Sequence, residues 1–276
     1  MYSRASCDPQ GWLGVIDLRT VPVRFSRLKK MALSPAHYLA AVQAGDDPSD
    51  SLAMRIGRGG HAILFGQPVA LWTGKTRNGA AWEEFKIEHQ GCEILNVKEH
   101  DQAASIVTAL QKHDLASKLL SMPGSVVERP IDWAFMGRAC RSTPDVRHSI
   151  YANHIIDLKT ARSTEPDRFV RAATWMHYHA QLAFYCDAVE FTTGERPAQA
   201  YIVAVESAPP YAVTVLRLTE RALDQGARLC RLWFERLLSC EASNEWPAYA
   251  QSVVDFDVPD QDEFRLTIDG EDVEVP

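Results

Sequence analysis

The sequence lacks any apolar run close to the roughly 18 residues that a membrane-spanning helix needs. No long apolar segment follows its first seven residues, which argues against a secretory signal. Its six cysteines include no C-x-x-C pair, so a disulfide framework, a zinc site or an iron–sulfur cluster is poorly supported. These absences favour a protein that works in the reducing cytoplasmic compartment and has no membrane partner.

Motifs that define several common enzyme classes are also missing. There is no P-loop, no glycine-rich dinucleotide fingerprint, no nucleophile elbow and no H-E-x-x-H zinc motif. There is no internal repeat and no low-complexity tract. The 276 residues, 46% of them hydrophobic, are enough for one large domain with a sizeable core.

The net charge of −7 at pH 7 hides an uneven distribution. Residues 261–276 hold six acidic side chains and one arginine, so much of the acidic excess is local. Arginines and lysines cluster at 24–30, 55–58, 138–147 and 162–171. Phosphate binding depends on the field in a groove, so the total charge excludes no nucleic-acid partner. Each basic cluster taken alone is best explained as a solvated face.

The hydrophobic pattern predicts helices first, then strands that alternate with further helices. Helices are expected over 34–41, 51–65, 101–121, 165–191 and 219–239. A strand meander is expected over 125–136, 138–140 and 149–160, and a strand pair over 199–206 and 211–218, whereas 69–98 should be irregular. This order predicts an α/β fold with a mixed central sheet flanked by helices.

Three glycines, Gly57, Gly59 and Gly60, interrupt the second predicted helix just before His61. Each glycine costs a helix up to about 1 kcal/mol relative to alanine. That cost predicts a close approach of the backbone to another helix or to a ligand. A lone histidine on a helix is more often a structural or surface residue than a ligand, but this setting favours a ligand role for His61.

Two carboxylates and a lysine form the most informative pattern. Asp145 follows Pro144, and Asp157-Leu158-Lys159 closes the apolar run of a predicted strand. Alternation along a strand puts Asp157 and Lys159 on one face. Mg²⁺ prefers oxygen ligands, usually one or two carboxylates with waters and a phosphate, so the pattern predicts a metal site. A Pro-Asp turn and an exposed D-x-K both occur by chance, so the rest of the chain must support this reading.

A polar stripe runs along the predicted helix over 165–191. Tyr178, Gln181 and Tyr185 occupy i, i+3 and i+7 of one helical face. An aromatic core stripe is the simpler explanation, but a buried Gln181 amide would need hydrogen-bond partners. Glu128 and Asp132 are possible additional carboxylates, although each could instead face solvent or pair with an arginine.

Taken together, these residues resemble the RecE-type exonuclease VIII family of PD-(D/E)XK nucleases. The resemblance covers about residues 26–250, between an N-terminal extension (1–25) and an acidic tail (251–276). It implies a PD-(D/E)XK restriction-endonuclease-like core. It rests on an ordered set of motifs: Ser34-Pro35-Ala36-His37-Tyr38, Gly57 with His61, Pro144-Asp145, Asp157-Leu158-Lys159-Thr160, Tyr178-His179 with Gln181, Ala183 and Tyr185, Val205-Glu206, and Pro210-Tyr211.

The resemblance implies a role for each site residue. The metal ligands would be His61, Asp145, Asp157 and the Leu158 carbonyl, holding Mg²⁺ or, as a substitute, Mn²⁺. Lys159 would activate the attacking water, and Gln181 and Tyr185 would position DNA or water. The DNA contacts would come from Arg58, Arg141, Arg147 and Tyr178. Thr143, where the family usually has arginine, and the Gly59-Gly60 pair depart from the family pattern.

The resemblance also implies a substrate and partners. Enzymes of this kind digest linear double-stranded DNA from a 5′ end and leave a 3′ single strand for an annealing protein of the RecT type. A homo-oligomeric ring, trimeric or tetrameric, is implied. The alternatives that stay open are a related endonuclease or single-strand nuclease, and a DNA-binding protein without nuclease activity.

Overall fold

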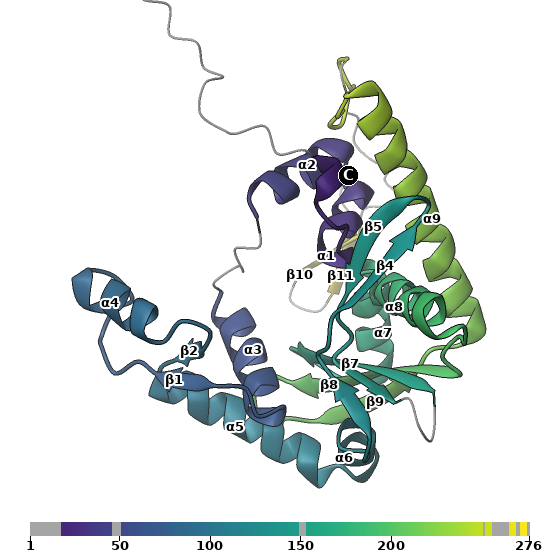
Figure 1. The fold of residues 1–276 in the computed structure, drawn as a ribbon. Coiled ribbons are helices and arrows are strands. Elements are labelled where there is room, and N and C mark those ends of the chain that lie inside the picture. The colour runs from purple at the N-terminus through teal and green to yellow at the C-terminus, as the bar shows by residue number, and fades with distance from the viewer. Residues whose placement is uncertain are drawn as a thin grey trace, which may run out of the picture.

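The centre of the molecule is a five-stranded mixed sheet (Figure 1). The computed structural model describes residues 18–45, 51–148, 153–250 and 252–255, and the backbone of two short strands beyond them. Much of the predicted N-terminal extension and acidic tail therefore lies outside the described residues. In spatial order the strands are β3 (Ser125–Val127), β6 (Val146–His148), β7 (His154–Ala161), β8 (Gln199–Glu206) and β9 (Val213–Arg217). β7 and β8 run parallel, whereas the other neighbours are antiparallel.

Helices cover both faces of this sheet, as the strand residues require. On β7, Ile155 packs into the core beneath α8 and α9, whereas Ile156 and Leu158 pack into the core beneath α3, α5 and α6. Two hydrophobic cores thus lie on opposite faces of one sheet. The flanking helices are α3 (Leu52–Leu64), α5 (Val97–Lys112), α6 (Asp114–Leu120), α7 (Pro166–Trp175), α8 (Tyr178–Thr193) and α9 (Glu220–Ser243).

Smaller elements surround this core. The hairpin of β4 and β5 packs against α8, and the N-terminal elements pack beside α9. None of the described helices is long and apolar enough to cross a membrane. These smaller elements are η1 (Leu18–Thr20), α1 (Phe25–Leu28), η2 (Lys29–Ala32), α2 (Pro35–Gln43), β1 (Val69–Leu71), α4 (Ala80–Glu88), β2 (Glu93–Leu95), β4 (Ile131–Phe135), β5 (Arg138–Ser142), β10 (Arg265–Ile268) and β11 (Glu271–Glu274).

Side-chain caps explain where several predicted helices begin. Ser34 and Ser51 accept hydrogen bonds from backbone amides in the first turns of α2 and α3, and Thr219 does the same for α9. Asn96 and Glu99 form a reciprocal capping box at the start of α5. The helices predicted over 34–41, 51–65 and 219–239 are confirmed.

Other local predictions are wrong. Residues 69–98 contain β1, α4 and β2 rather than irregular chain, and the predicted helix over 101–121 is broken at His113. The expected hairpin around Gly137 is confirmed by β4 and β5, but the single meander is wrong, because this hairpin forms a separate sheet and β3 pairs with β6. The long helix over 165–191 is two helices, because His177 adopts a left-handed conformation with φ 60°.

The glycines of α3 do serve close backbone approach, as predicted. A Cβ at Gly57 would lie 3.0 Å from Thr160 Oγ1, and one at Gly59 would lie 2.6 Å from Leu95 Cδ1. The first contact brings α3 onto the end of β7, and the second brings it onto β2. The glycines therefore allow α3 to deliver His61 to the edge of β7.

Two histidines on adjacent strands predict a loss of stability in acid. His148 and His154 pair across β6 and β7 with ring centroids 6.0 Å apart. Burial lowers the pKa of both rings, and His148 further lowers the pKa of His154. Below about pH 6.5 these two imidazoles are protonated in the unfolded chain but stay neutral in the folded chain. The free energy of unfolding therefore falls as pH falls.

The expected result is a smaller pH dependence in His154→Phe, which keeps an aromatic ring against Tyr201. Urea midpoints at pH 7.5 and 5.5 measure this difference. The control is Gln111→Phe, which adds an aromatic ring at an exposed site of α5 that does not titrate and should keep the wild-type pH dependence. An unchanged pH dependence in His154→Phe would contradict the prediction.

Candidate active site

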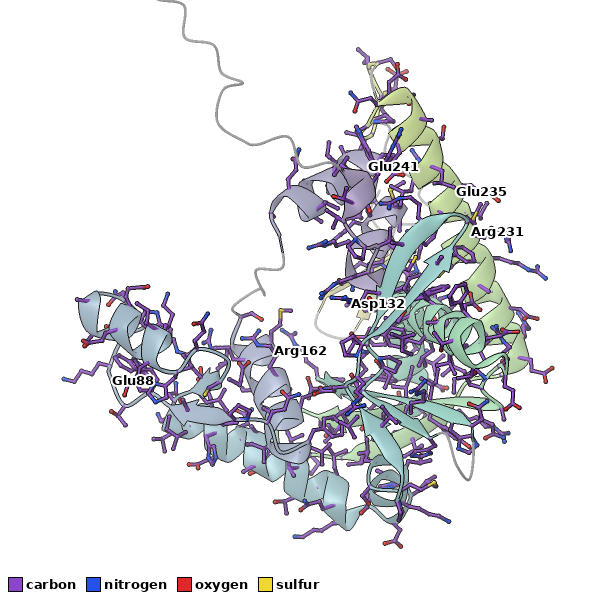
Figure 2. The ribbon with its side chains drawn as sticks, viewed as in Figure 1. Glu88, Asp132, Arg162, Arg231, Glu235 and Glu241 are labelled. Atoms are coloured by element: carbon purple, nitrogen blue, oxygen red, sulfur yellow. The ribbon has the colours of Figure 1, made fainter. Side chains whose placement is uncertain are left out.

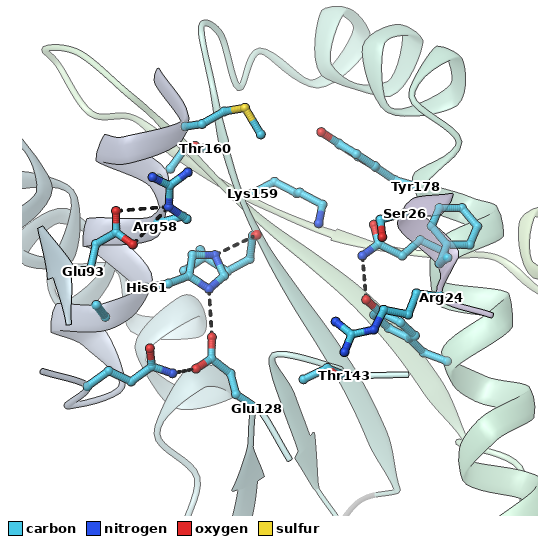
Figure 3. Close-up of a pocket in the computed structure, with 18 of the residues that line it drawn as sticks. Arg24, Ser26, Arg58, His61, Glu93, Glu128, Thr143, Lys159, Thr160 and Tyr178 are labelled. Carbon is cyan, nitrogen blue, oxygen red and sulfur yellow. Dashed lines mark hydrogen bonds and ion pairs between the residues drawn. The ribbon is translucent and has the colours of Figure 1, made fainter. Parts of the chain in front are cut away.

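A cavity of about 980 Å³ opens at the carboxyl end of β7. Residues of α1 form one wall and residues of α3 form the opposite wall (Figure 3). β7 contributes Leu158, Lys159 and Thr160, and α8 contributes Gln181 and Tyr185. Most of the polar residues singled out in the sequence therefore meet in one place.

β7 places Asp157 and Lys159 side by side, as strand alternation predicts. Lys159 Nζ lies 2.5 Å from Asp157 Oδ2, and the two side chains are 18% and 1% exposed. Burial lowers the pKa of Lys159, but the carboxylates of Asp157 and Asp145 outweigh it and raise the pKa above its ordinary value. Lys159 is therefore a fixed positive charge beside a buried carboxylate.

Asp145 reaches the same place from the segment between β5 and β6. Its Oδ2 accepts a hydrogen bond of 2.6 Å from the backbone N–H of Leu158. Burial and the neighbouring Asp157 raise the pKa of Asp145 to about 6. Two carboxylates held this close repel each other, and a bound cation would relieve that repulsion.

His61 approaches from α3 on the opposite side. Its Nε2 lies 3.3 Å from the Leu158 carbonyl oxygen and 3.9 Å from Asp145 Oδ2. Its Nδ1 lies 3.4 Å from Glu128 Oε1. Burial lowers the pKa of His61, but Asp145 and Glu128 outweigh it and raise the pKa above its ordinary value.

Glu128 follows directly after β3 and adopts a left-handed conformation with φ 45°. Its backbone N–H donates to the Asp145 carbonyl at 2.9 Å, which ties β3 to the segment that carries Asp145. Its side chain contacts His61 and accepts from Gln67. The sequence marked Glu128 only as a possible extra carboxylate, and the fold brings it to the site.

The donor set fits a hard divalent cation. Ligand atoms of His61, Glu128 and Asp145 all lie within 4.8 Å of one another. Asp157 Oδ2 is buried beside the Lys159 ammonium, which lies 2.5 Å away. Carboxylate and carbonyl oxygens with one imidazole suit Mg²⁺ or Mn²⁺ better than a soft metal.

The predicted helical stripe of Tyr178, Gln181 and Tyr185 lies on α8 and borders this site. Gln181 Nε2 donates to Asp157 Oδ1 at 3.3 Å and to the Tyr185 hydroxyl at 2.8 Å. The NH₂ group of this half-buried amide is therefore hydrogen-bonded on two sides. Burial and Asp157 raise the pKa of the Tyr185 hydroxyl, so Tyr185 stays protonated. The Tyr178 ring lies 4.8 Å from Lys159 Nζ, a cation–π distance.

The structure separates the arginines named as DNA contacts. Arg58 lines the cavity and pairs with Glu93 at 3.0 Å. Arg141 also lines it and holds Asp132 at 2.6 Å on the exposed hairpin, where Figure 2 labels Asp132. Arg147 lies on β6 and does not line the cavity.

Three residues of the wall formed by α1 and the start of η2 were not named as site residues from the sequence. Arg24, Ser26 and Lys29 line the cavity opposite α3. Burial, the nearby Lys159 and Lys30 lower the pKa of Lys29. Arg24 and Lys29 lay in a basic cluster of the sequence, but nothing there indicated which face of the chain they occupy.

The mixed sheet with helices on both faces, together with Asp145, Asp157 and Lys159 at the end of β7, is the arrangement of the PD-(D/E)XK class. The chain belongs to the family described as PDDEXK-like domain of unknown function (DUF3799), whose model matches residues 24–255. Membership places the protein in the PD-(D/E)XK nuclease superfamily. This match does not identify the RecE-type subfamily, which the chain resembles only through the motifs given above.

A solved structure has the same fold. A candidate exonuclease from Eubacterium rectale, 16% identical, aligns over 87% of this chain and 92% of that chain with a TM-score of 0.61. LHK-Exo, solved in complex with dAMP, is 15% identical over 71% of this chain and 96% of its own. Its TM-score of 0.27 is too low to carry an argument. No protein with a curated description matches the sequence.

Proposed function

We propose that this protein is a Mg²⁺-dependent exodeoxyribonuclease that hydrolyses linear double-stranded DNA. The observation that carries the proposal is the convergence of two carboxylates, a backbone carbonyl, an imidazole and a lysine at one end of an open cavity. That constellation matches the metal ligands and the lysine expected of a phosphodiester hydrolase. The superfamily supports nuclease chemistry, and the family resemblance supports digestion from an end.

The residues have separate tasks in the proposed reaction. His61, Asp145, Asp157 and the Leu158 carbonyl would hold Mg²⁺ or Mn²⁺. A bound ion of this kind polarises a phosphate and lowers the pKa of a water ligand. Lys159 supplies a fixed positive charge where negative charge develops on the phosphate oxygens.

The α8 residues act on this arrangement indirectly. Gln181 holds Asp157 Oδ1, and Tyr185 holds the Gln181 amide in turn. The carboxylate is therefore oriented from two sides, by Lys159 and by Gln181. Preorganised groups of this kind lose little free energy to rearrangement when the substrate arrives.

Polarity and assembly rest on the resemblance to the exonuclease VIII family. It supports 5′-to-3′ digestion, a ring of three or four copies, and delivery of the 3′ single strand to an annealing protein of the RecT type. Double-stranded DNA ends are then the substrate, and closed circular DNA is resistant.

One experiment tests activity, metal dependence and polarity together. Linear duplex labelled at either the 5′ or the 3′ end is incubated with Mg²⁺ or with EDTA. Immediate release of the 5′ label as mononucleotide, only with Mg²⁺, is the expected result. Cleavage of closed circular duplex would indicate an endonuclease, and preference for single strands a single-strand nuclease. DNA binding without hydrolysis would contradict the proposed function.

A further inference from the structure

The helix α7 lies between two segments that form the cavity. Lys159 and Thr160 at the end of β7 line the cavity before α7 begins, and Met176 lines it directly after α7 ends. The last residue of α7, Trp175, is therefore next in the chain to the cavity wall. Its side chain is 79% exposed, an unusual position for tryptophan.

One exposed face of α7 combines this tryptophan with two arginines. Arg168, Arg171 and Trp175 occupy i, i+3 and i+7, so they form a single row on the helix. All three are exposed, whereas Phe169 and Ala173 on another face are buried. We call this row the α7 face. At 1.5 Å rise per residue it is about 10 Å long.

Two carboxylates lie near the arginines of the α7 face, Glu165 at the N-cap of the helix and Asp167 in its first turn. Within the described chain, neither Arg168 nor Arg171 forms an ion pair within 4.0 Å. The nearby Glu165 carboxylate accepts hydrogen bonds from the backbone N–H groups of Asp167 and Arg168. Those bonds, with the charges of Arg168 and Arg171, lower the pKa of Glu165. The Glu165 carboxylate thus caps the helix, and both arginine residues are exposed.

An exposed indole beside two arginines suits a nucleic-acid strand. Guanidinium groups pair with phosphates, and an aromatic ring stacks on a base whose face is open. In a duplex interior the base faces are covered by their neighbours, so the exposed ring of Trp175 selects unpaired or terminal bases. Arg162, exposed in the segment between β7 and α7 and labelled in Figure 2, adds a further positive charge.

We propose that the α7 face binds unpaired nucleotides of the DNA substrate beside the cavity. Trp175 stacks on a base, and Arg168 and Arg171 pair with the flanking phosphates. This proposal deepens the proposed nuclease function and rests on it.

The test measures binding in EDTA, so that hydrolysis does not interfere. The probes are a fluorescein-labelled 20-nucleotide oligothymidylate and a blunt duplex of equal length, titrated by anisotropy at several salt concentrations. Trp175→Ala should bind the oligothymidylate about tenfold more weakly, and Trp175→Phe should stay within about twofold of wild type. Blunt duplex binding should change little in either variant.

The arginines are tested by charge reversal with a matched control. Arg168→Glu with Arg171→Glu should reduce the slope of log affinity against log salt by about 1.5. The control is Arg221→Glu with Arg228→Glu, an equal charge change at exposed sites of α9 away from the cavity. The control should bind both probes as wild type does.

Two results would overturn the proposal. One is wild-type binding of oligothymidylate by Trp175→Ala. The other is a smaller assembly of Trp175→Ala in sedimentation with an equal loss of affinity for both probes, which would make the α7 face a contact between copies of the chain. Wild-type hydrolysis of duplex with Mg²⁺ is measured in parallel. If the wild-type protein did not hydrolyse duplex DNA, the nuclease function itself would be contradicted. The two results above contradict only the proposal that the α7 face binds unpaired nucleotides.

Discussion

Lys159→Ala should lower the rate of Mg²⁺-dependent duplex digestion by about 10³-fold, the scale of losing one preorganised charge at a transition state. Lys159 is suited to this role because its ammonium is fixed by Asp157 at 2.5 Å and by the ring of Tyr178 at 4.8 Å. Truncation of Lys159 to alanine should lose little packing, because the side chain lines the cavity. The loss should therefore appear in the turnover rate of a protein that still folds.

Removal of Lys159 also leaves the Asp157 carboxylate buried without its counter-charge. We therefore expect a lower melting temperature in EDTA that Mg²⁺ partly restores, because a bound cation supplies the missing charge. Lys112→Ala on the exposed end of α5 is the matched control and should digest DNA at the wild-type rate. Full activity of Lys159→Ala would show that neither this lysine nor the proposed site takes part in the reaction.

The part of the site that could be predicted from sequence is the part set by local geometry. Asp157 and Lys159 share a face because strand side chains alternate, and this holds wherever the strand lies in the sheet. Gln181 and Tyr185 follow from helical spacing in the same way. Local spacing alone does not bring the strand residues and the helix residues together. That prediction came from the family resemblance, which rests on the order of the motifs along the chain.

The parts that could not be predicted depend on tertiary pairing. β3 pairs with β6 across the intervening hairpin, and periodicity alone does not choose a strand's partner. The break between α7 and α8 occurs at His177, where no glycine or proline marks it. Glu128 reaches His61 only because β3 ends beside Asp145. Such positions are fixed by packing rather than by local propensity.

Gly226→Ala should destabilise the protein by about 1–3 kcal/mol, although alanine favours a helix by up to about 1 kcal/mol over glycine. The reason is the crossing of α9 over α8. A Cβ at Gly226 would lie 2.5 Å from the His179 carbonyl oxygen and 2.8 Å from Ala180 Cα. Both are backbone atoms, so no side-chain rotation relieves the contact and the helices must separate. Cys230, one turn along α9, also touches the Ala180 carbonyl through its Sγ at 3.4 Å.

Separation of these helices would also reach the active site. α8 carries Gln181 and Tyr185, so a shift of its first turns lengthens the hydrogen bond from Gln181 to Asp157. The expected result is a lower urea midpoint together with reduced nuclease activity at temperatures where Gly226→Ala is still folded. Gln225→Ala, at the exposed neighbouring position, tests helix propensity without the clash and should keep both properties. A Gly226→Ala variant as stable as wild type would mean that α8 and α9 do not cross at backbone contact, and Gln181 would then need another explanation for its position.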